Sequence, residues 1–405
     1  MKTRLLAIAC VALAAVLVVV LLATPACVKQ PAIKLGVPYP MTGPYAADGV
    51  EIIAGVTLAV EEINAQGGLL GRPLEVLMAD TKALAPEDVD AAAKLLAQQG
   101  VEVFIAGYAN YPACLTFGKY DILYLSFDAN TAFRRDFLAD REEYWNVFQV
   151  GGVEALHAIN AFETITKRPP YHPPNKKAAI VSVDAPYFST IAKAFEKVAT
   201  EGGWEIVLHK LHPWGTTEFG AELAKIRKEN PSIIFASFMD VASVRAFMDG
   251  FLRNPTQSIV YFEYAPGIPE FLQVLGDSAN GIVWTIVLAY LPNDRGQAFV
   301  QRFKERLRRE PGFSTPSTLY DTVNIWAQGV RNAGSLDQRA IAKAILANPY
   351  EGVNGKYVFS PEDQYAISGD DLPIHFVQIQ NGKQVLLFLE DKPQAKFQTP
   401  PWIKL

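Results

Sequence analysis

The stretch 32–68, AIKLGVPYPMTGPYAADGVEIIAGVTLAVEEINAQGG, decides how the rest of the chain is interpreted. An apolar run from Ile33 to Tyr39 predicts a short buried strand, and the prolines and glycine after it predict a turn. From about Ala47 the apolar residues recur at helical spacing until Gly67-Gly68, a pair typical of a helix end. The loop between strand and helix therefore lies at the carboxyl end of a strand, where α/β folds bind ligands.

The same alternation of strand and helix continues through the next two hundred residues. In the first half we expect strands at 74–79, 101–106 and 122–126, helices at 86–99 and 108–119, and an irregular charged stretch at 128–143. In the second half we expect strands at 178–183, 205–211, 232–237 and 258–262, and helices at 154–167, 187–202, 218–230 and 241–252. This order predicts two parallel sheets with right-handed crossovers.

The last third of the chain is richer in helices. We expect a strand at 281–287, three helices at 296–309, 317–334 and 336–348, and a small antiparallel set of strands near 356–359, 374–380 and 383–389. This section makes no third sheet of its own, so we expect it to cross back and complete both earlier halves. The prediction is an α/β fold of two Rossmann-like lobes joined by a multi-strand hinge: 33–149 plus 286–355, 150–285 plus 356–392, and a tail at 393–405.

The composition narrows the class of protein. With 405 residues, 50% of them hydrophobic, the chain can build a large core. The net charge of -5, without a basic run interleaved with aromatic residues, argues against nucleic acid as a partner. Once Cys10 and Cys27 are set aside only Cys114 remains, which excludes an intramolecular disulfide in the mature body.

The first 27 residues have the pattern of an export signal. Lys2 and Arg4 precede an unbroken apolar run, and a polar stretch begins at Thr24. The small residues before Cys27 resemble a bacterial lipoprotein cleavage site, which predicts a lipid on Cys27. Plain cleavage and an uncleaved anchor remain open, because about 20 apolar residues span a bilayer. Each alternative puts the body outside the cytoplasmic membrane, in the periplasm or on the outer face of the cell membrane.

Motifs of catalysis and metal binding are missing from the sequence. It contains no G-x-S-x-G, H-E-x-x-H or G-x-x-x-x-G-K-[ST], and the five histidines form no ligand-like cluster. His209 and His212 lie on an expected strand, where a spacing of three points them to opposite faces. We therefore expect no catalytic residue, no metal and no cofactor.

The remaining candidates are polar and aromatic residues in loops at strand ends, which converge on one cleft when two lobes face each other. Glu263 follows the apolar strand IVYF, so it is a counter-charge for a ligand ammonium, a salt-bridge partner of a local Lys or Arg, or exposed at the strand end. Tyr187 is either a wall of the cleft or an N-terminal staple of its helix. Asp128 and Asn130 either cap a turn or flank free backbone N–H groups that suit a carboxylate.

The opening stretch also resembles a known family. The runs MTGPY, AVEEINAQGG and GRPLE resemble the amino-terminal segment of type I periplasmic binding proteins that serve branched-chain amino acid importers, the leucine/isoleucine/valine-binding family. The resemblance extends over about Ile33 to Leu389. It implies the type I periplasmic binding protein fold, in which two lobes close on a small ligand.

Several positions match ligand-contacting positions of this family. The resemblance assigns the ligand carboxylate to Asn110 or Tyr111 and to Asp128 and Asn130, and the ligand ammonium to Glu263. It assigns aromatic contacts to Tyr187 and Phe238, and it places Asp48 where the family often has an aromatic residue. The walls of the pocket could instead come from the aromatic side chains of Tyr45, Tyr108, Tyr111 and Trp284.

The resemblance implies a monomeric solute-binding protein that is not an enzyme. Its expected partners are an amino acid or related small polar solute, the permease of an ABC importer, and the membrane through a lipid or N-terminal anchor. A ligand sensor of the same fold and a secreted α/β hydrolase remain alternatives. The sequence leaves the identity of the ligand open.

Overall fold

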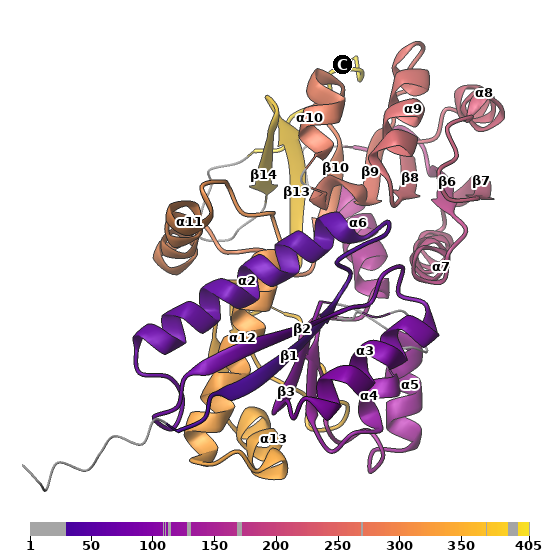
Figure 1. The fold of residues 1–405 in the computed structure, drawn as a ribbon. Coiled ribbons are helices and arrows are strands. Elements are labelled where there is room, and N and C mark those ends of the chain that lie inside the picture. Colours follow the sequence, from indigo (N-terminus) through magenta and orange to yellow (C-terminus); the bar gives the residue numbers. More distant parts are fainter. Residues whose placement is uncertain are drawn as a thin grey trace, which may run out of the picture.

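The computed structural model describes residues 30–107, 109, 111, 115–127, 131–167, 172–268, 270–369, 371–387 and 396–404. It has two lobes, each built around its own sheet (Figure 1). The two lobes confirm the predicted architecture.

The first lobe contains a five-stranded sheet in the order β2-β1-β3-β4-β5. Its strands are β1 (Ile33–Tyr39), β2 (Leu74–Asp80), β3 (Val103–Ala106), β4 (Leu123–Ser126) and β5 (Val147–Gln149), and every pairing is parallel. The helices between them are α2 (Ala46–Ala65), α3 (Pro86–Gln98), α4 (Leu115–Gly118) and α5 (Thr131–Ala139). The strand, loop and helix expected in the opening stretch are β1, the turn after it and α2.

Helix α5 contradicts the irregular stretch expected at 128–143. Phe133 and Phe137 lie four residues apart, so they share one face of the helix and are fully buried. The charged residues between them, such as Arg134 and Arg135, hide this short apolar stripe in the sequence. Packing against the core of the lobe, rather than a strong local pattern, therefore explains the helix.

The second lobe contains a seven-stranded sheet in the order β14-β13-β10-β9-β8-β6-β7. The parallel strands are β6 (Lys177–Val183), β7 (Glu205–His212), β8 (Ile233–Phe238), β9 (Ile259–Tyr264) and β10 (Val283–Ile286). The strands β13 (His375–Gln380) and β14 (Lys383–Leu387) are antiparallel. The helices are α6 (Ala155–Lys167), α7 (Pro186–Glu201), α8 (Gly220–Glu229), α9 (Val241–Leu252) and α10 (Phe271–Leu275), with short 3-10 turns η1 (Ala265–Gly267) and η2 (Gly276–Ala279).

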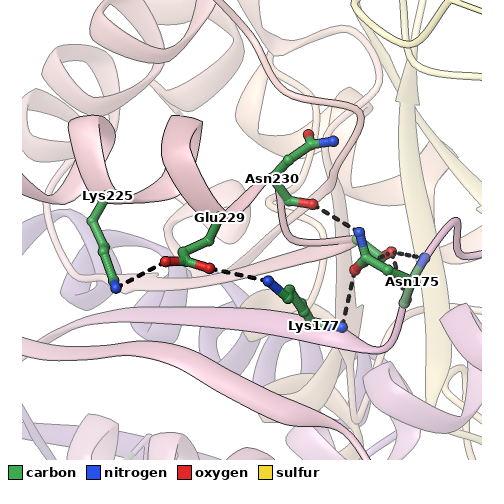
Figure 2. A network of polar contacts seen from close by, with 6 residues as sticks. Asn175, Lys177, Lys225, Glu229 and Asn230 are labelled. Carbon is green, nitrogen blue, oxygen red and sulfur yellow. Dashed lines mark hydrogen bonds and ion pairs between the residues drawn. The ribbon is translucent and has the colours of Figure 1, made fainter.

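A polar network ties the end of α8 to the beginning of β6 (Figure 2). Asn230 ends α8 in the left-handed region with φ 47°, and its carbonyl accepts a hydrogen bond from Asn175 Nδ2 at 2.9 Å. The backbone N–H of Lys177 donates to Asn175 Oδ1 at 3.0 Å, and Glu229 lies between the ammonium groups of Lys177 and Lys225, 3.0 Å from each. These contacts hold the amino-terminal edge of the sheet, which is the edge away from the cavity described below.

The last third of the chain adds helices to the first lobe. They are α11 (Asp294–Leu307), α12 (Thr315–Ala333) and α13 (Gln338–Ala347). Helix α12 packs so closely on α2 that a Cβ atom on Gly55 would lie 2.1 Å from the carbonyl oxygen of Pro316. Beyond α13, the strands β11 (Tyr350–Glu351) and β12 (Lys356–Tyr357) pair with each other and, among the described residues, with no other strand, so this section does form a small sheet that we did not expect.

The chain passes between the lobes after β5, after β10 and between β12 and β13. The last of these segments runs beside the end of β5, where Gln149 N donates to Gln364 O at 3.0 Å and Ala366 N donates to Gln149 O at 2.9 Å. Tyr357 and Phe359 belong to the core of the first lobe. Leu372 belongs to the same core, so we infer that the second lobe resumes beyond residue 372 rather than at 356.

Each of the two large sheets has a hydrophobic core on both faces. Alternate residues of a strand point to opposite faces, so Ile105 packs with α2 and α12 whereas Phe104 packs with α3 and α5. The residues 396–404, expected to be part of a tail, include Trp402, which is 6% exposed and donates its indole N–H to Ser258 O at 2.9 Å. Within the described part of the chain, no helix combines the length and the hydropathy of a membrane span.

Candidate ligand-binding site

A cavity of about 600 Å³ lies between the two lobes. The first lobe lines it with the beginning of α2, with α5 and with the beginning of α12; the second lobe lines it with α6 and with the carboxyl ends of β6, β8, β9 and β10. Its volume falls within the range of roughly 300 to 1,000 Å³ that is usual for small-molecule sites. Because carboxyl ends of parallel strands meet at one edge of a sheet, residues far apart in sequence come together here.

Glu263 is a buried carboxylate of this cavity. It lies next to the last residue of β9 and is 1% exposed. Tyr261 Oη donates to Glu263 Oε2 at 2.5 Å, Tyr187 Oη donates to Oε1 at 3.4 Å, and His157 Nδ1 lies 3.7 Å from Oε1. Burial raises the pKa of Glu263, although His157 and the two tyrosines oppose this shift.

Two of the readings left open for Glu263 are therefore excluded within the described residues. The side chain forms no ion pair with a Lys or Arg there, and it is not exposed at the strand end. The phenols of Tyr187 and Tyr261 and the ring of His157 replace such a partner. Tyr187 also lines the cavity, with its ring edge-on to Phe188 at a centroid distance of 5.1 Å.

Sequence reasoning missed Glu154 and His157, which also line the cavity. Glu154 is 5% exposed, and its Oε2 accepts hydrogen bonds from the backbone N–H and the hydroxyl of Thr131, at 2.8 and 2.7 Å. Burial raises the pKa of the Glu154 carboxyl, while the Thr131 hydrogen bonds act in the opposite direction. The sequence places Glu154 where the chain is predicted to cross between the lobes, and this position could have marked it as a candidate. Its hydrogen-bond partner Thr131, however, begins helix α5, which the sequence did not predict.

At the cavity, contacts between described residues join the beginning of α2 to the second lobe. Tyr264 Oη, in the second lobe, donates a hydrogen bond to Asp48 Oδ2 on α2 of the first. Tyr45, just before α2, meets the ring of Trp214 edge-on, with the centroids 5.8 Å apart. Both Tyr45 and Asp48 line the cavity, so the structure places them at the contact between the lobes.

The remaining sequence-predicted residues divide into three groups. Tyr111 lines the cavity, where its phenol donates to Asp136 and accepts from Arg135 Nη2 at 3.3 Å, and Trp284 lines it as well. Phe238 does not: it is 2% exposed and packs against the rings of Phe219, Phe247 and Phe262 in the core, while its neighbour Met239 lines the cavity. Outside the described residues lie Cys27, Tyr108, Asn110, Cys114, Asp128 and Asn130.

The described residues contain no group of three or more His, Cys, Asp and Glu side chains that could hold a metal ion. His209 lies beside Glu196 of α7 at 3.0 Å and His212 beside Glu222 of α8 at 3.5 Å, on opposite faces of the sheet. The Ser182 hydroxyl is fully buried and donates to Val183 O at 3.2 Å, so it is not placed as a nucleophile.

The fold and the cavity define a class of protein. The family described as periplasmic binding protein matches residues 32–384, so the chain belongs to that family. The fold is the type I periplasmic binding protein fold that the opening stretch predicted.

Individual relatives carry more specific names. The leucine-, isoleucine-, valine-, threonine- and alanine-binding protein of Pseudomonas aeruginosa is 24% identical over 336 residues, covering 81% of this chain and 85% of its own. A solved putative branched-chain amino acid ABC transporter from Silicibacter pomeroyi is 27% identical with a TM-score of 0.85, covering 92% of this chain and 100% of its own. A solute-binding protein from R. palustris, solved with benzoate, has the same fold at 21% identity and a TM-score of 0.71, covering 88% of this chain and 95% of its own.

Proposed function

We propose that this protein is an extracytoplasmic solute-binding protein of an ABC importer that binds an amino acid or a related amine in the cavity between its lobes. It releases the solute to a permease and does no chemistry on it. The observation that carries the proposal is Glu263, a carboxylate 1% exposed in a cavity between two lobes, surrounded by phenols and a histidine.

The physical argument concerns the charge of Glu263. A buried carboxylate without a cationic partner is costly, and a ligand ammonium would offset that cost. Hydrogen bonds between an ammonium and a carboxylate in a closed cavity belong to the strong kind. The name of the Pseudomonas aeruginosa relative, an amino acid-binding protein, supports this ligand class.

Delivery to a permease requires two recognisable states of the protein. The contacts of Tyr264 with Asp48 and of Tyr45 with Trp214 exist only while the lobes touch. A ligand that contacts both lobes favours that closed arrangement, which gives a membrane partner a shape to recognise. We also propose that the protein is a monomer held at the outer face of the membrane through Cys27; the intact mass of the membrane-extracted protein would test the lipid.

The test is titration calorimetry of the purified protein with leucine, isoleucine, valine, threonine, alanine and benzoate. Glu263→Gln should weaken amino acid binding by about 10- to 100-fold, because a hydrogen bond to a charged group contributes about 1.5–3 kcal/mol. Glu222→Gln serves as the control, since Glu222 is a buried carboxylate of the same lobe that does not line the cavity.

Two outcomes would contradict the proposal. Equal affinity of Glu263→Gln and the unaltered protein would exclude the ammonium contact. Turnover of an ester or amide substrate that is lost on mutating one Ser or His would instead favour the hydrolase. A sensor of the same fold would bind the same ligands, so reconstituted transport with a permease separates these two roles.

A further inference from the structure

More negatively than positively charged side chains line the cavity. Three carboxylates line it, those of Asp48, Glu154 and Glu263, whereas Arg135 is the one Lys or Arg among its described lining residues. The guanidinium of Arg135 lies 2.7 Å from Asp136, and its side chain is 70% exposed. The carboxylate that neutralises the charge of Arg135 therefore lies outside the cavity lining, and the lining itself has an excess of negatively charged side chains.

Glu154 adds to this excess from a fixed position. Its Oε2 accepts hydrogen bonds from the first backbone N–H and the first hydroxyl of α5, both of Thr131. The side chain is 5% exposed and lines the cavity. The carboxylate of Glu154 is thus held at the beginning of α5 by Thr131 while it lines the cavity.

Glu154 and Glu263 act on the same part of the cavity. Both carboxylates bear on the phenol of Tyr187, whose pKa is raised well above its ordinary value, first by burial and then by the charges of Glu263 and Glu154. His157, 8% exposed, lies in the same part of the cavity, with its Nδ1 3.7 Å from Glu263 Oε1. Neither carboxylate has a Lys or Arg partner within the described chain.

We propose that Glu154 and Glu263 form a paired acidic site that selects a ligand with two cationic nitrogen centres, a basic amino acid or a diamine, over a zwitterion with an aliphatic side chain. This inference rests on the proposed function and names the substrate class of its site. A single ammonium offsets one buried carboxylate and leaves the other uncompensated. A second cationic nitrogen pairs the other carboxylate, while a ligand of net negative charge, such as benzoate, is repelled.

The test compares L-lysine with L-norleucine, two amino acids that differ by the terminal amino group. Calorimetry on the full chain should show lysine binding at least about tenfold more tightly than norleucine, since this is the effect of one charge-assisted contact. Glu154→Gln should bring the ratio of lysine affinity to norleucine affinity to within about threefold of one, mainly through a loss of lysine affinity. Gln retains an oxygen for the Thr131 N–H, so the variant should fold.

The control is Glu163→Gln on the exposed face of α6, the helix that begins directly after Glu154; Glu163 pairs there with Lys167. It should leave the ratio unaltered. A ratio near one in the unaltered protein, or a ratio that Glu154→Gln does not change, would overturn the paired site. If Glu263→Gln then still weakens both amino acids, only this inference fails.

A third ligand, 1,5-diaminopentane, tests the case in which neither amino acid binds well. If lysine, norleucine and 1,5-diaminopentane all fail to bind, the paired acidic site fails, and if leucine, isoleucine, valine, threonine and alanine fail as well, the proposed function fails with it. Binding of 1,5-diaminopentane that depends on Glu154 would support the paired site even where both amino acids are weak ligands.

Discussion

Replacing Tyr264 by Phe should weaken ligand binding although its phenol donates to another protein group. Tyr264 Oη donates to Asp48 Oδ2, and the two residues belong to different lobes, 216 positions apart in sequence. The bond therefore exists only when the lobes touch. In an open form both groups are hydrated, so Tyr264→Phe removes a contact from the closed form alone.

The expected loss of ligand affinity follows from this difference between the open and closed forms. A hydrogen bond to a charged acceptor contributes about 1.5–3 kcal/mol, and we take the lower end because water reaches the partners when the lobes separate. Because apparent affinity falls in proportion to the population of the binding-competent form, a change of about 1.4 kcal/mol weakens binding about tenfold.

Calorimetry with the tighter of lysine and leucine measures the affinity, and small-angle X-ray scattering with and without ligand measures closure. Tyr320→Phe is the matched control, because Tyr320 donates to Glu62 Oε2 at 2.7 Å within the first lobe. That variant should lower the free energy of unfolding by about 1–2 kcal/mol without changing affinity. Unchanged affinity in Tyr264→Phe, or an equal loss in Tyr320→Phe, would refute the reasoning.

Two further predictions concern stability. Burial lowers the pKa of His375 from 6.5 to about 4, so the unfolded chain takes up a proton on this residue at a higher pH than the folded protein does. The free energy of unfolding should therefore fall by about 3 kcal/mol as the pH falls from 6.5 to 4. In urea titrations His375→Phe should lack this part of the fall in unfolding free energy, and identical pH profiles of the two proteins would contradict the prediction. Gly55→Ala should lower the free energy of unfolding by about 1–3 kcal/mol, because the added methyl group meets the carbonyl of Pro316. A Cβ atom on Gly220 meets nothing within 4 Å, so Gly220→Ala should leave the midpoint temperature of thermal unfolding unchanged or slightly higher.

Local patterns were enough to predict most of the elements. Strand β9 and the position of Glu263 at its end follow from the apolar run IVYF, and α2 follows from apolar residues at helical spacing. Helix α5 could not be found in this way, because Phe133 and Phe137 gain their burial from distant elements of the core. The resemblance assigned Phe238 to the site, but the side chain of this last residue of β8 turns into the core, and its neighbour Met239 lines the cavity.

The sequence by itself determined the alternation of strands and helices, the two lobes and the residues at their strand ends, because these depend on neighbours within a few positions. Only the tertiary structure decided which of those residues meet. At the cavity, Thr131 meets Glu154 over 23 positions of sequence, and Tyr264 meets Asp48 over 216. Such pairs arise from the way whole lobes pack, and the spacing of residues along one strand or helix carries no record of that packing.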